Sequence, residues 1–260
     1  MTAVAPGIAV LLAPNPGPMT LDGTNTWILG RPGGPSIVVD PGPADEEHLQ
    51  RVRARAGEVV DIVVTHRHLD HTEGAARLAA LTGSGVRAAD PAYALPSGDG
   101  SDPEGLEDGT QLQVGDLALR VIATPGHTSD SVCLLVAGPE GCRLLTGDTV
   151  LGRGTTVITH PDGDLGAYLD SLDVLLDVVG EHAVLALLPG HGPVVDAPQR
   201  VLRHYREHRR QRLDQVRAAV RQGDRTPTEV VARVYADVDR SVWPAAEQSV
   251  RAQLDYLRDH

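Results

Sequence analysis

Residues 65–74 read THRHLDHTEG. Within six positions this stretch holds four metal-capable side chains: His66, His68, Asp70 and His71. The preceding run, VVDIVVT at 59–65, is apolar and β-branched, which is typical of a strand buried on both faces. The following run, EGAARLAAL at 73–81, favours a helix. The cluster is therefore predicted on the turn between a buried strand and a helix, where rigid scaffolds commonly hold reactive groups.

The spacing within this stretch carries chemical information. In an extended segment, residues two apart project to the same side, so His66 and His68 can bind one ion together. Asp70 and His71 follow where the chain must turn, and they could face a second ion. Imidazole suits zinc, and a carboxylate favours a second divalent ion. The alternative is a polar surface loop where histidines gather by chance, but three of the 11 His fall within six positions.

Three further segments each end an apolar run with Gly and then one ligand-type residue. The runs at 119–123, 143–146 and 183–188 lead respectively to His127 (TPGH), Asp148 (GD) and His191 (PGHG). Glycine lets the backbone turn tightly, so that a short side chain can reach a shared point. Together with the first cluster, these residues predict one site assembled from several strand ends.

At this point the chain resembles the metallo-β-lactamase-fold hydrolases, through HRHLDH at 66–71 and the three later ligands. The family implies an α/β (α+β) fold, a four-layer αββα sandwich with two zinc ions, or other divalent ions, at one edge. Carried over residue by residue, the first zinc would bind His66, His68 and His127. The second would bind Asp70, His71 and His191. Asp148 would bridge both ions together with a hydroxide, which makes Asp70 and Asp148 the expected catalytic carboxylates.

A narrower resemblance rests on PNPGPMTLDGTNTWILG at 14–30, LGRGTTV at 151–157 and a helical tail after PGHGP. These segments look like the lactamase-β-like protein 2 group, whose better-known member is a single-strand-selective endoribonuclease. The resemblance implies a phosphodiesterase that cleaves single-stranded RNA with a metal-bridging hydroxide. It also implies two domains, a catalytic domain at 1–199 and a helical C-terminal domain at 200–260.

Candidate substrate contacts flank the expected metal site. They are Thr24, Asn25, Thr26, Arg153, Thr155, Thr156 and His160. The family places the entry loop GTN beside the active-site mouth, although Asn25 could equally support a turn. Arg153 could neutralise a phosphate while the two later threonines donate hydrogen bonds, or it could be a solvent-facing turn residue. His160 could act as a general acid.

Asp40 ends the apolar run SIVVD at 36–40. We expect it to orient a ligand histidine from behind, and the alternative is that it caps the helix predicted within 44–56. On that helix, His48 is expected to be exposed. Ser131 stands where close relatives often carry a substrate-contacting His, which weakens the predicted phosphate contact.

Composition also constrains the core, the catalytic mechanism and the cellular location. The 260 residues are 41% hydrophobic, which is enough for a sizeable core, and Phe is absent, so the core must be aliphatic. All 23 basic residues are Arg, which excludes a lysine-based mechanism. Cys133 and Cys142 are expected to be reduced. We find neither a convincing signal peptide nor a membrane-length apolar run, so we expect a cytoplasmic protein. The oligomeric state stays open.

The tail differs from the body in charge. Residues 200–221 carry eight Arg and two acids, a formal charge of +6, whereas residues 1–199 carry 10 Arg and 26 acids. This asymmetry could steer nucleic acid, or the helix could be a solvated face with internal ion pairs. Two more helices are predicted at 226–237 and 244–258, with start signals at Thr226 before Pro227 and at Trp243 before Pro244. The three helices resemble a winged-helix tail that lacks its β-wing.

Two other functions remain open. A thioester or lactone hydrolase of the glyoxalase II type would use the same seven ligands on a small-molecule ester or thioester, and the acidic body and Ser131 favour it. A non-catalytic domain with structural zinc is disfavoured, because structural zinc sites are usually closed and four-coordinate. No ordered acid–His–Ser set is evident, and Cys133 lies within a predicted strand, so a nucleophilic triad is not expected.

Overall fold

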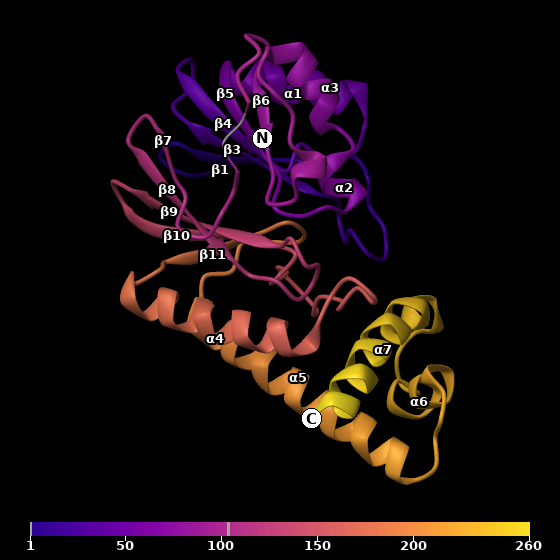
Figure 1. The fold of residues 1–260 in the computed structure, drawn as a ribbon. Coiled ribbons are helices and arrows are strands. Elements are labelled where there is room, and N and C mark those ends of the chain that lie inside the picture. The colour runs from indigo at the N-terminus through magenta and orange to yellow at the C-terminus, as the bar shows by residue number, and fades with distance from the viewer. Residues whose placement is uncertain (1, 103–104) are drawn as a thin grey trace.

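The computed structural model describes residues 2–102 and 105–260. Two sheets pack face to face and helices cover their outer sides, which gives the four layers that the family resemblance implies (Figure 1). Helices α1 (Glu46–Ala56) and α3 (Ala75–Thr82) cover the first sheet. Helices α4 (Leu165–Glu181) and α5 (Pro198–Arg221) cover the second.

The first sheet has the strand order β1-β2-β3-β4-β5-β6. Its strands are β1 (Thr2–Ala5), β2 (Ile8–Leu12), β3 (Asn25–Gly30), β4 (Pro35–Val39), β5 (Glu58–Val63) and β6 (Gly85–Arg87). The second sheet has the order β11-β10-β9-β8-β7. Its strands are β7 (Gln111–Val114), β8 (Leu117–Ala123), β9 (Val132–Gly138), β10 (Gly141–Gly147) and β11 (Ala186–Pro189). The pairs β4–β5, β5–β6 and β10–β11 are parallel, and the other pairs are antiparallel.

The period-2 alternation of strand side chains separates the apolar layers. On β3, Trp27 and Leu29 enter the core between the sheets, while Ile28 packs under α1 and α3. On β9, Leu134 faces the core between the sheets and Leu135 faces α4. Both faces of each sheet are therefore buried, which explains why the central strands read as continuous apolar runs.

The parallel strands determine where the chain leaves the sheets. β4 and β5 run in the same direction and β10 and β11 share theirs, so the carboxyl ends within each pair lie at one edge. Direct backbone contacts join the two sheets at this edge: Val132 N–H donates to the Thr65 carbonyl, and Asn25 N–H donates to the Gly190 carbonyl. The loops that follow the strands consequently meet at one rim of the sandwich.

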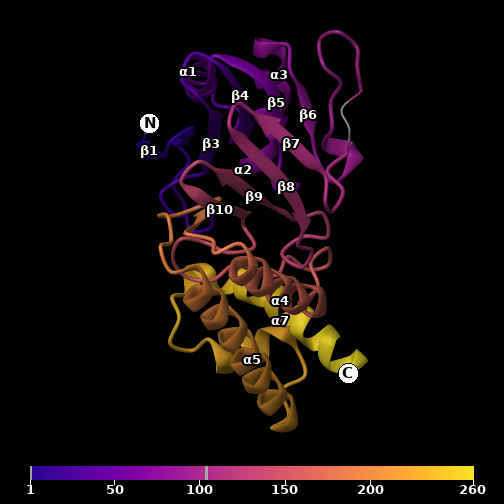
Figure 2. The ribbon, with the colours of Figure 1, turned by 90° about the vertical axis from the view of Figure 1, so that its left-hand side faces the viewer.

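Helix α5 belongs to two cores. Its first half places Leu202 and Tyr205 against α4, and its second half packs against α6 (Pro227–Val234) and α7 (Trp243–Asp259) (Figure 2). Helix α6 begins with a capping box between Thr226 and Glu229, as its sequence predicts. In the described chain after β11 the regular elements are helical, as predicted for the tail. The domain boundary at 199/200 stays a prediction, since α5 spans it.

One local prediction from the sequence is wrong. His48 was expected to be exposed, yet it is 0% exposed and its Nε2 lies 3.0 Å from Thr26 Oγ1. Its position on α1 is four residues before Val52, which is also buried, so both side chains lie on the inward face of the helix. The cap of α1 is Asp45, because its side chain accepts the His48 N–H. Asp40 is consequently free for another role.

Both cysteines are free thiols, as expected. The sequence patterns did not predict several short elements. These are β1, β6, the single-turn helix α2 (Leu69–Thr72) and two short 3-10 helices, Pro91–Tyr93 and Arg240–Val242. No helix within the described ranges is long and apolar enough to cross a bilayer.

Candidate metal centre

The seven predicted ligand residues meet at the rim of the sandwich in two groups. The first group is His66, His68, His127 and Asp148, and the second is Asp70, His71 and His191. Within each group the candidate ligand atoms all lie within 4.8 Å of one another. These residues come from loops that follow β5, β8, β10 and β11, as the strand-end pattern predicts.

The turn after β5 is tighter than predicted, since it contains the single helical turn α2. Asp70 and His71 are carried by α2, and His68 precedes its first residue. Gly74 ends this turn, and a Cβ there would lie 2.9 Å from the Gly42 carbonyl oxygen and 2.9 Å from Leu49 Cδ2. Only glycine therefore allows the turn to lie this close to the loop after β4.

Distances in the first group match the spacing of ligands around a metal. His68 Nδ1 lies 3.1 Å from His66 Nε2 and 3.1 Å from His127 Nε2. Ligand atoms at 2.0–2.1 Å around a tetrahedral zinc stand roughly 3.3 Å apart. Three imidazole nitrogens thus converge as they would around one ion.

The second group converges in the same way. His191 Nε2 lies 3.2 Å from His71 Nε2 and 3.0 Å from Asp70 Oδ2. Asp148 lies between the groups: its Oδ1 is 3.5 Å from His71 Nε2, and its Oδ2 is 3.9 Å from His127 Nε2. Asp148 Oδ1 is also buried without a hydrogen-bond partner among the described residues. A buried carboxylate oxygen without a donor is costly, and a shared cation would satisfy it.

Partners behind the histidines fix which nitrogen faces the cluster. Asp40 Oδ2 lies 2.9 Å from His71 Nδ1, which agrees with the orienting role predicted for Asp40. His127 Nδ1 lies 2.6 Å from the Val157 carbonyl oxygen, and His191 Nδ1 lies 3.1 Å from that of Gly23. A carbonyl accepts a proton from Nδ1–H, so Nε2 keeps its lone pair for a metal. These contacts therefore preset the ligand tautomers.

Electrostatics of the cluster favour ionised carboxylates. Burial alone would raise the pKa of Asp148, but His191 and His71 hold that pKa well below its usual range. Burial lowers the pKa of His127 to about 4 and overcomes the opposing effect of Asp148. At His191 the outcome is reversed, since Asp148 and Asp70 overcome burial and raise its pKa to about 9. The site thus combines buried anions with imidazoles, a donor set that fits divalent cations.

A pocket of about 370 Å³ opens beside the cluster and includes His127 and Asp148 in its lining. One wall comes from the loop around Met19 and Leu21, and the opposite wall comes from α5, α7 and the segment between α6 and α7. The C-terminal helices therefore form part of the cavity into which the candidate metal site opens.

The three residues of the entry loop have supporting positions. The Asn25 side-chain amide donates to the carbonyls of Pro189 and Gly192, at 3.0 and 2.8 Å. Thr24 Oγ1 donates to the Asp70 carbonyl, and Thr26 contacts His48. Thr24 and Thr26 are 0% exposed, so their hydroxyls cannot contact a bound substrate. The entry loop therefore connects the turn that carries Asp70, the end of β11 and helix α1. It has this supporting role in place of the predicted substrate contact.

The other candidate contacts are divided between the pocket and its surroundings. Arg153 and Thr155 line the pocket, where Arg153 pairs with Asp22. Thr156 is buried, and its Oγ1 lies 3.1 Å from His127 Nδ1, so it supports a ligand. His160 faces a different pocket and its Nε2 lies 3.0 Å from Asp255 Oδ2, which places it outside the pocket of the cluster.

Ser131 is also unavailable to a substrate. Its side chain is buried, and its Oγ lies 2.7 Å from Thr128 Oγ1 within the loop after β8.

Sequence reasoning missed Arg67, which lies between two ligand histidines. Its guanidinium pairs with three carboxylates from separate loops, Asp90, Asp130 and Asp162, at 3.0–3.2 Å. It thereby ties the ligand-bearing turn to the loops around His127 and the segment before α4. The acids lie 23, 63 and 95 residues away from Arg67, so no local pattern could have identified them.

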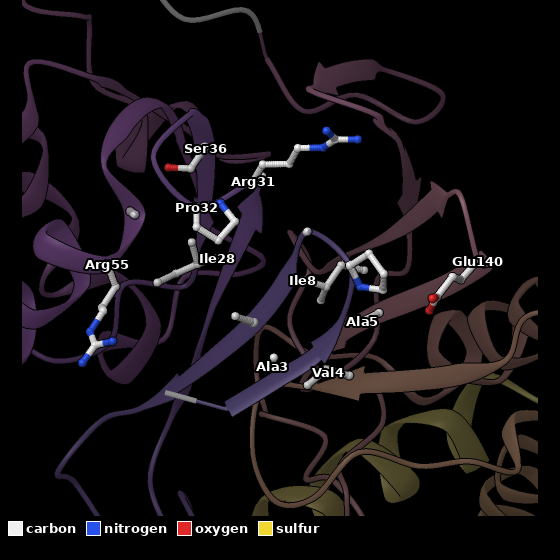
Figure 3. A pocket seen from close by; sticks show the side chains of 15 residues that line it. Ala3, Val4, Ala5, Ile8, Ile28, Arg31, Pro32, Ser36, Arg55 and Glu140 are labelled. Carbon is white, nitrogen blue, oxygen red and sulfur yellow. The ribbon is translucent and has the colours of Figure 1, made fainter.

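A second cavity, of about 520 Å³, is unrelated to the ligand cluster (Figure 3). It lies over β1, β2 and β3, and Ile8, Ile28, Ser36 and Arg55 are among its lining residues. Ser36 is near the start of β4, whereas the strand leads to Asp40 at its other end. None of the seven ligand residues lines this cavity.

Comparisons with known proteins agree with this geometry. Residues 19–193 match the family described as Metallo-beta-lactamase superfamily, and residues 226–259 match the Beta-lactamase associated winged helix domain. The chain is 34% identical over 259 residues to the Beta-lactamase-like protein 2 homolog of Caenorhabditis elegans, covering 95% of this chain and 82% of the relative. It is 32% identical over 226 residues to the Atrochrysone carboxyl ACP thioesterase of Aspergillus fumigatus, covering 84% and 66%.

Among solved structures, a metallo-beta-lactamase family protein from Thermus thermophilus matches with a TM-score of 0.79 at 21% identity. The match covers 99% of this chain and 95% of that one, so the likeness of fold includes the C-terminal helices.

Proposed function

Because the chain belongs to the metallo-beta-lactamase superfamily of hydrolases, we propose that its seven ligands hold two zinc ions that serve hydrolysis. One ion would be held by His66, His68 and His127, and the other by Asp70, His71 and His191. Asp148 would be shared. The observation that carries the proposal is the convergence of both groups on the buried carboxylate of Asp148, whose Oδ1 lacks a donor among the described residues.

When bound, such ions supply Lewis acidity and a hydroxide near neutral pH. The chain itself supplies orientation and a proton acceptor. The Asp70 side chain is 28% exposed against 10% for Asp148, so Asp70 is the carboxylate that can take a proton from an entering water. His71 and His191 lower the pKa of Asp70 against the effect of burial, which keeps this carboxylate ionised.

For the substrate, we first propose the phosphodiester of single-stranded RNA. Similarity to a Beta-lactamase-like protein 2 homolog over nearly the whole chain supports this class, as does the winged helix match. Helix α5 also has exposed arginines, including Arg200, Arg203 and Arg210. Part of its charge is internal, however, because Arg206 pairs with Asp173 and Arg217 pairs with Asp214.

A thioester or lactone is the second candidate, and specific observations favour it. Apolar side chains such as Leu21, Leu151, Val238 and Val242 line the pocket beside the ligands, and its volume suits a small molecule. A thioesterase is among the relatives at 32% identity. The free thiols support our further proposal of a reducing, cytoplasmic location.

The test uses purified, zinc-loaded protein with single-stranded RNA and, in parallel, S-lactoylglutathione. Asp70→Ala is the catalytic control, and Asp45→Asn is the matched control because it alters only the cap of α1. RNA cleavage that Asp70→Ala abolishes and Asp45→Asn retains would support the nuclease. Thioester turnover with intact RNA would overturn the nuclease and support the second candidate. Inactivity toward both would contradict both substrate classes.

A further inference from the structure

The pocket beside the ligands has an unbalanced positive charge. Three arginines line it, and Asp148 is its one acidic lining residue. Arg153 is neutralised by Asp22. Arg209 and Arg212, in contrast, have no carboxylate within ion-pair distance in residues 2–102 and 105–260. This is unexpected in a chain with a formal net charge of −12, in which acids outnumber bases.

Arg209 is the more unusual of the two because it is only 2% exposed. Its Nη2 donates to the Thr156 carbonyl, and its guanidinium carbon lies 5.2 Å from the centre of the Tyr168 ring. Its Nε is buried and has no partner in the described chain, and neither does Nδ1 of the adjacent His208. Buried charges are normally paired, since an unpaired one costs several kcal/mol. An anion that enters the pocket would supply the missing partner.

The helix directs these groups to one place. Residues 205, 208, 209 and 212 lie on one face of α5, following the i, i+3, i+4, i+7 pattern. Arg212 is held in position from the other side, because its Nη1 donates to the Val234 carbonyl at 2.9 Å and its guanidinium lies 4.6 Å from the Tyr235 ring. Helix α5 runs from beside α4 to α6 and α7 (Figure 1). His208, Arg209 and Arg212 line the pocket, whereas Tyr205 packs against α4.

The cations are also connected to the ligand cluster. The carbonyl of Thr156 accepts the Arg209 hydrogen bond, while its hydroxyl contacts His127 Nδ1. A molecule in this pocket would thus meet metal-ligand residues, guanidinium groups and apolar side chains.

We propose that Arg209 and Arg212 form a subsite for an oxyanion of the substrate, a carboxylate or a phosphate, while the bond to be cleaved lies at the metal ligands. That the occupant is a substrate rests on the proposed hydrolase function, whereas the binding of an anion at this site does not. The subsite selects molecules that carry an anionic group in addition to the scissile bond. Neither residue is needed for the chemistry, so both act on affinity and selectivity.

Binding is tested with the full, zinc-loaded chain by titration calorimetry, with inorganic phosphate and succinate as separate probes at fixed ionic strength. Arg212→Gln and Arg209→Gln are the test variants. Arg210→Gln is the matched control, because Arg210 is the next residue of the same helix and is exposed. We expect affinity for at least one probe to fall about tenfold or more in both test variants and to be unchanged in Arg210→Gln.

Equal affinity in all four proteins would mean that the anion binds elsewhere, for example at the metals, and would overturn the subsite. The absence of binding by the unaltered protein would also overturn it. Arg212→Gln keeps the test valid if Arg209→Gln fails to fold, since Arg212 is partly exposed.

A kinetic comparison separates this inference from the proposed function. The substrates are the succinyl and butyryl thioesters of N-acetylcysteamine, which differ in a terminal carboxylate. We expect Arg212→Gln to lower kcat/KM about tenfold for the succinyl ester, mainly through KM, and less than twofold for the butyryl ester. Equal losses would overturn the subsite and leave hydrolysis standing. If neither ester nor RNA is cleaved while probe binding depends on Arg212, the proposed function fails and the anion site stands.

Discussion

Replacing Asp40 by Asn tests how strongly the residues behind the ligands control metal binding. Asp40 is 1% exposed, accepts two hydrogen bonds and lies close to one histidine. Its Oδ1 accepts Thr65 N–H at 2.8 Å, and its Oδ2 accepts Thr65 Oγ1–H at 2.8 Å and faces His71 Nδ1 at 2.9 Å. The substitution keeps the size and one carbonyl oxygen, but it replaces an accepting oxygen with an NH₂ group.

The consequence follows from donor and acceptor counting. If the amide oxygen keeps the Thr65 N–H, the NH₂ group faces His71 Nδ1–H, and two donors cannot pair. The imidazole then favours the other tautomer, which places its proton on Nε2, the atom that faces Asp148 and His191. A protonated Nε2 cannot bind a metal. Loss of such an orienting partner typically lowers metal affinity 10- to 100-fold, or about 1.4–2.7 kcal/mol.

Stability should also fall, because charge-assisted hydrogen bonds contribute about 1.5–3 kcal/mol each. We would measure zinc affinity by competition with a chromophoric chelator, and the free energy of unfolding by urea denaturation of the metal-free protein. Asp45→Asn is the isosteric control. Wild-type affinity for both zinc ions in Asp40→Asn would refute the reasoning, since it would show that His71 does not depend on Asp40 for its tautomer.

Three further predictions concern other parts of the fold. Arg67→Ala should reduce the free energy of unfolding by about 1–3 kcal/mol in urea melts, because it breaks three ion pairs between loops; a change under 0.5 kcal/mol would show that the loops hold without it. Burial and Arg51 lower the pKa of His48 to about 4 from 6.5, so the free energy of unfolding should fall by at most about 3 kcal/mol between pH 6.5 and 4. His48→Gln should lose this part of the pH dependence, and an unchanged pH profile would contradict the assignment. Gly190→Ala should abolish zinc binding in a chelator assay, since its Cβ would lie 2.6 Å from Asp148 Oδ1; normal binding would contradict the close packing.

The sequence identifies the ligand cluster so well because five of the seven ligands follow a strand end within a few residues. His66 and His68 follow β5, His127 follows β8, and Asp148 directly follows β10. Burial on both faces made these strands continuous apolar runs, and glycines marked the turns after them. The four layers were predicted through the family resemblance that these ligand motifs carry.

Features that depend on contacts between distant segments could not be predicted. The burial of His48 depends on which face α1 turns toward β3. Histidine is a polar residue, so the sequence alone indicates an exposed position. The entry loop was predicted to contact substrate because the family places it beside the active-site mouth. The partners of Asn25 and Thr26 lie instead on β11, on the loop after it and on α1. Arg209 belongs to a run of arginines, and only the packing of α5 distinguishes it from its exposed neighbour Arg210.

The most direct test of the account is the number of zinc ions per chain, measured by elemental analysis after dialysis. We expect two in the unaltered protein and one in His71→Gln, because His66, His68 and His127 form a group that does not need His71. We also expect hydrolysis to be lost along with the second ion. A single ion or none in the unaltered protein, or hydrolysis that persists after chelation has removed all metal, would contradict the central claim.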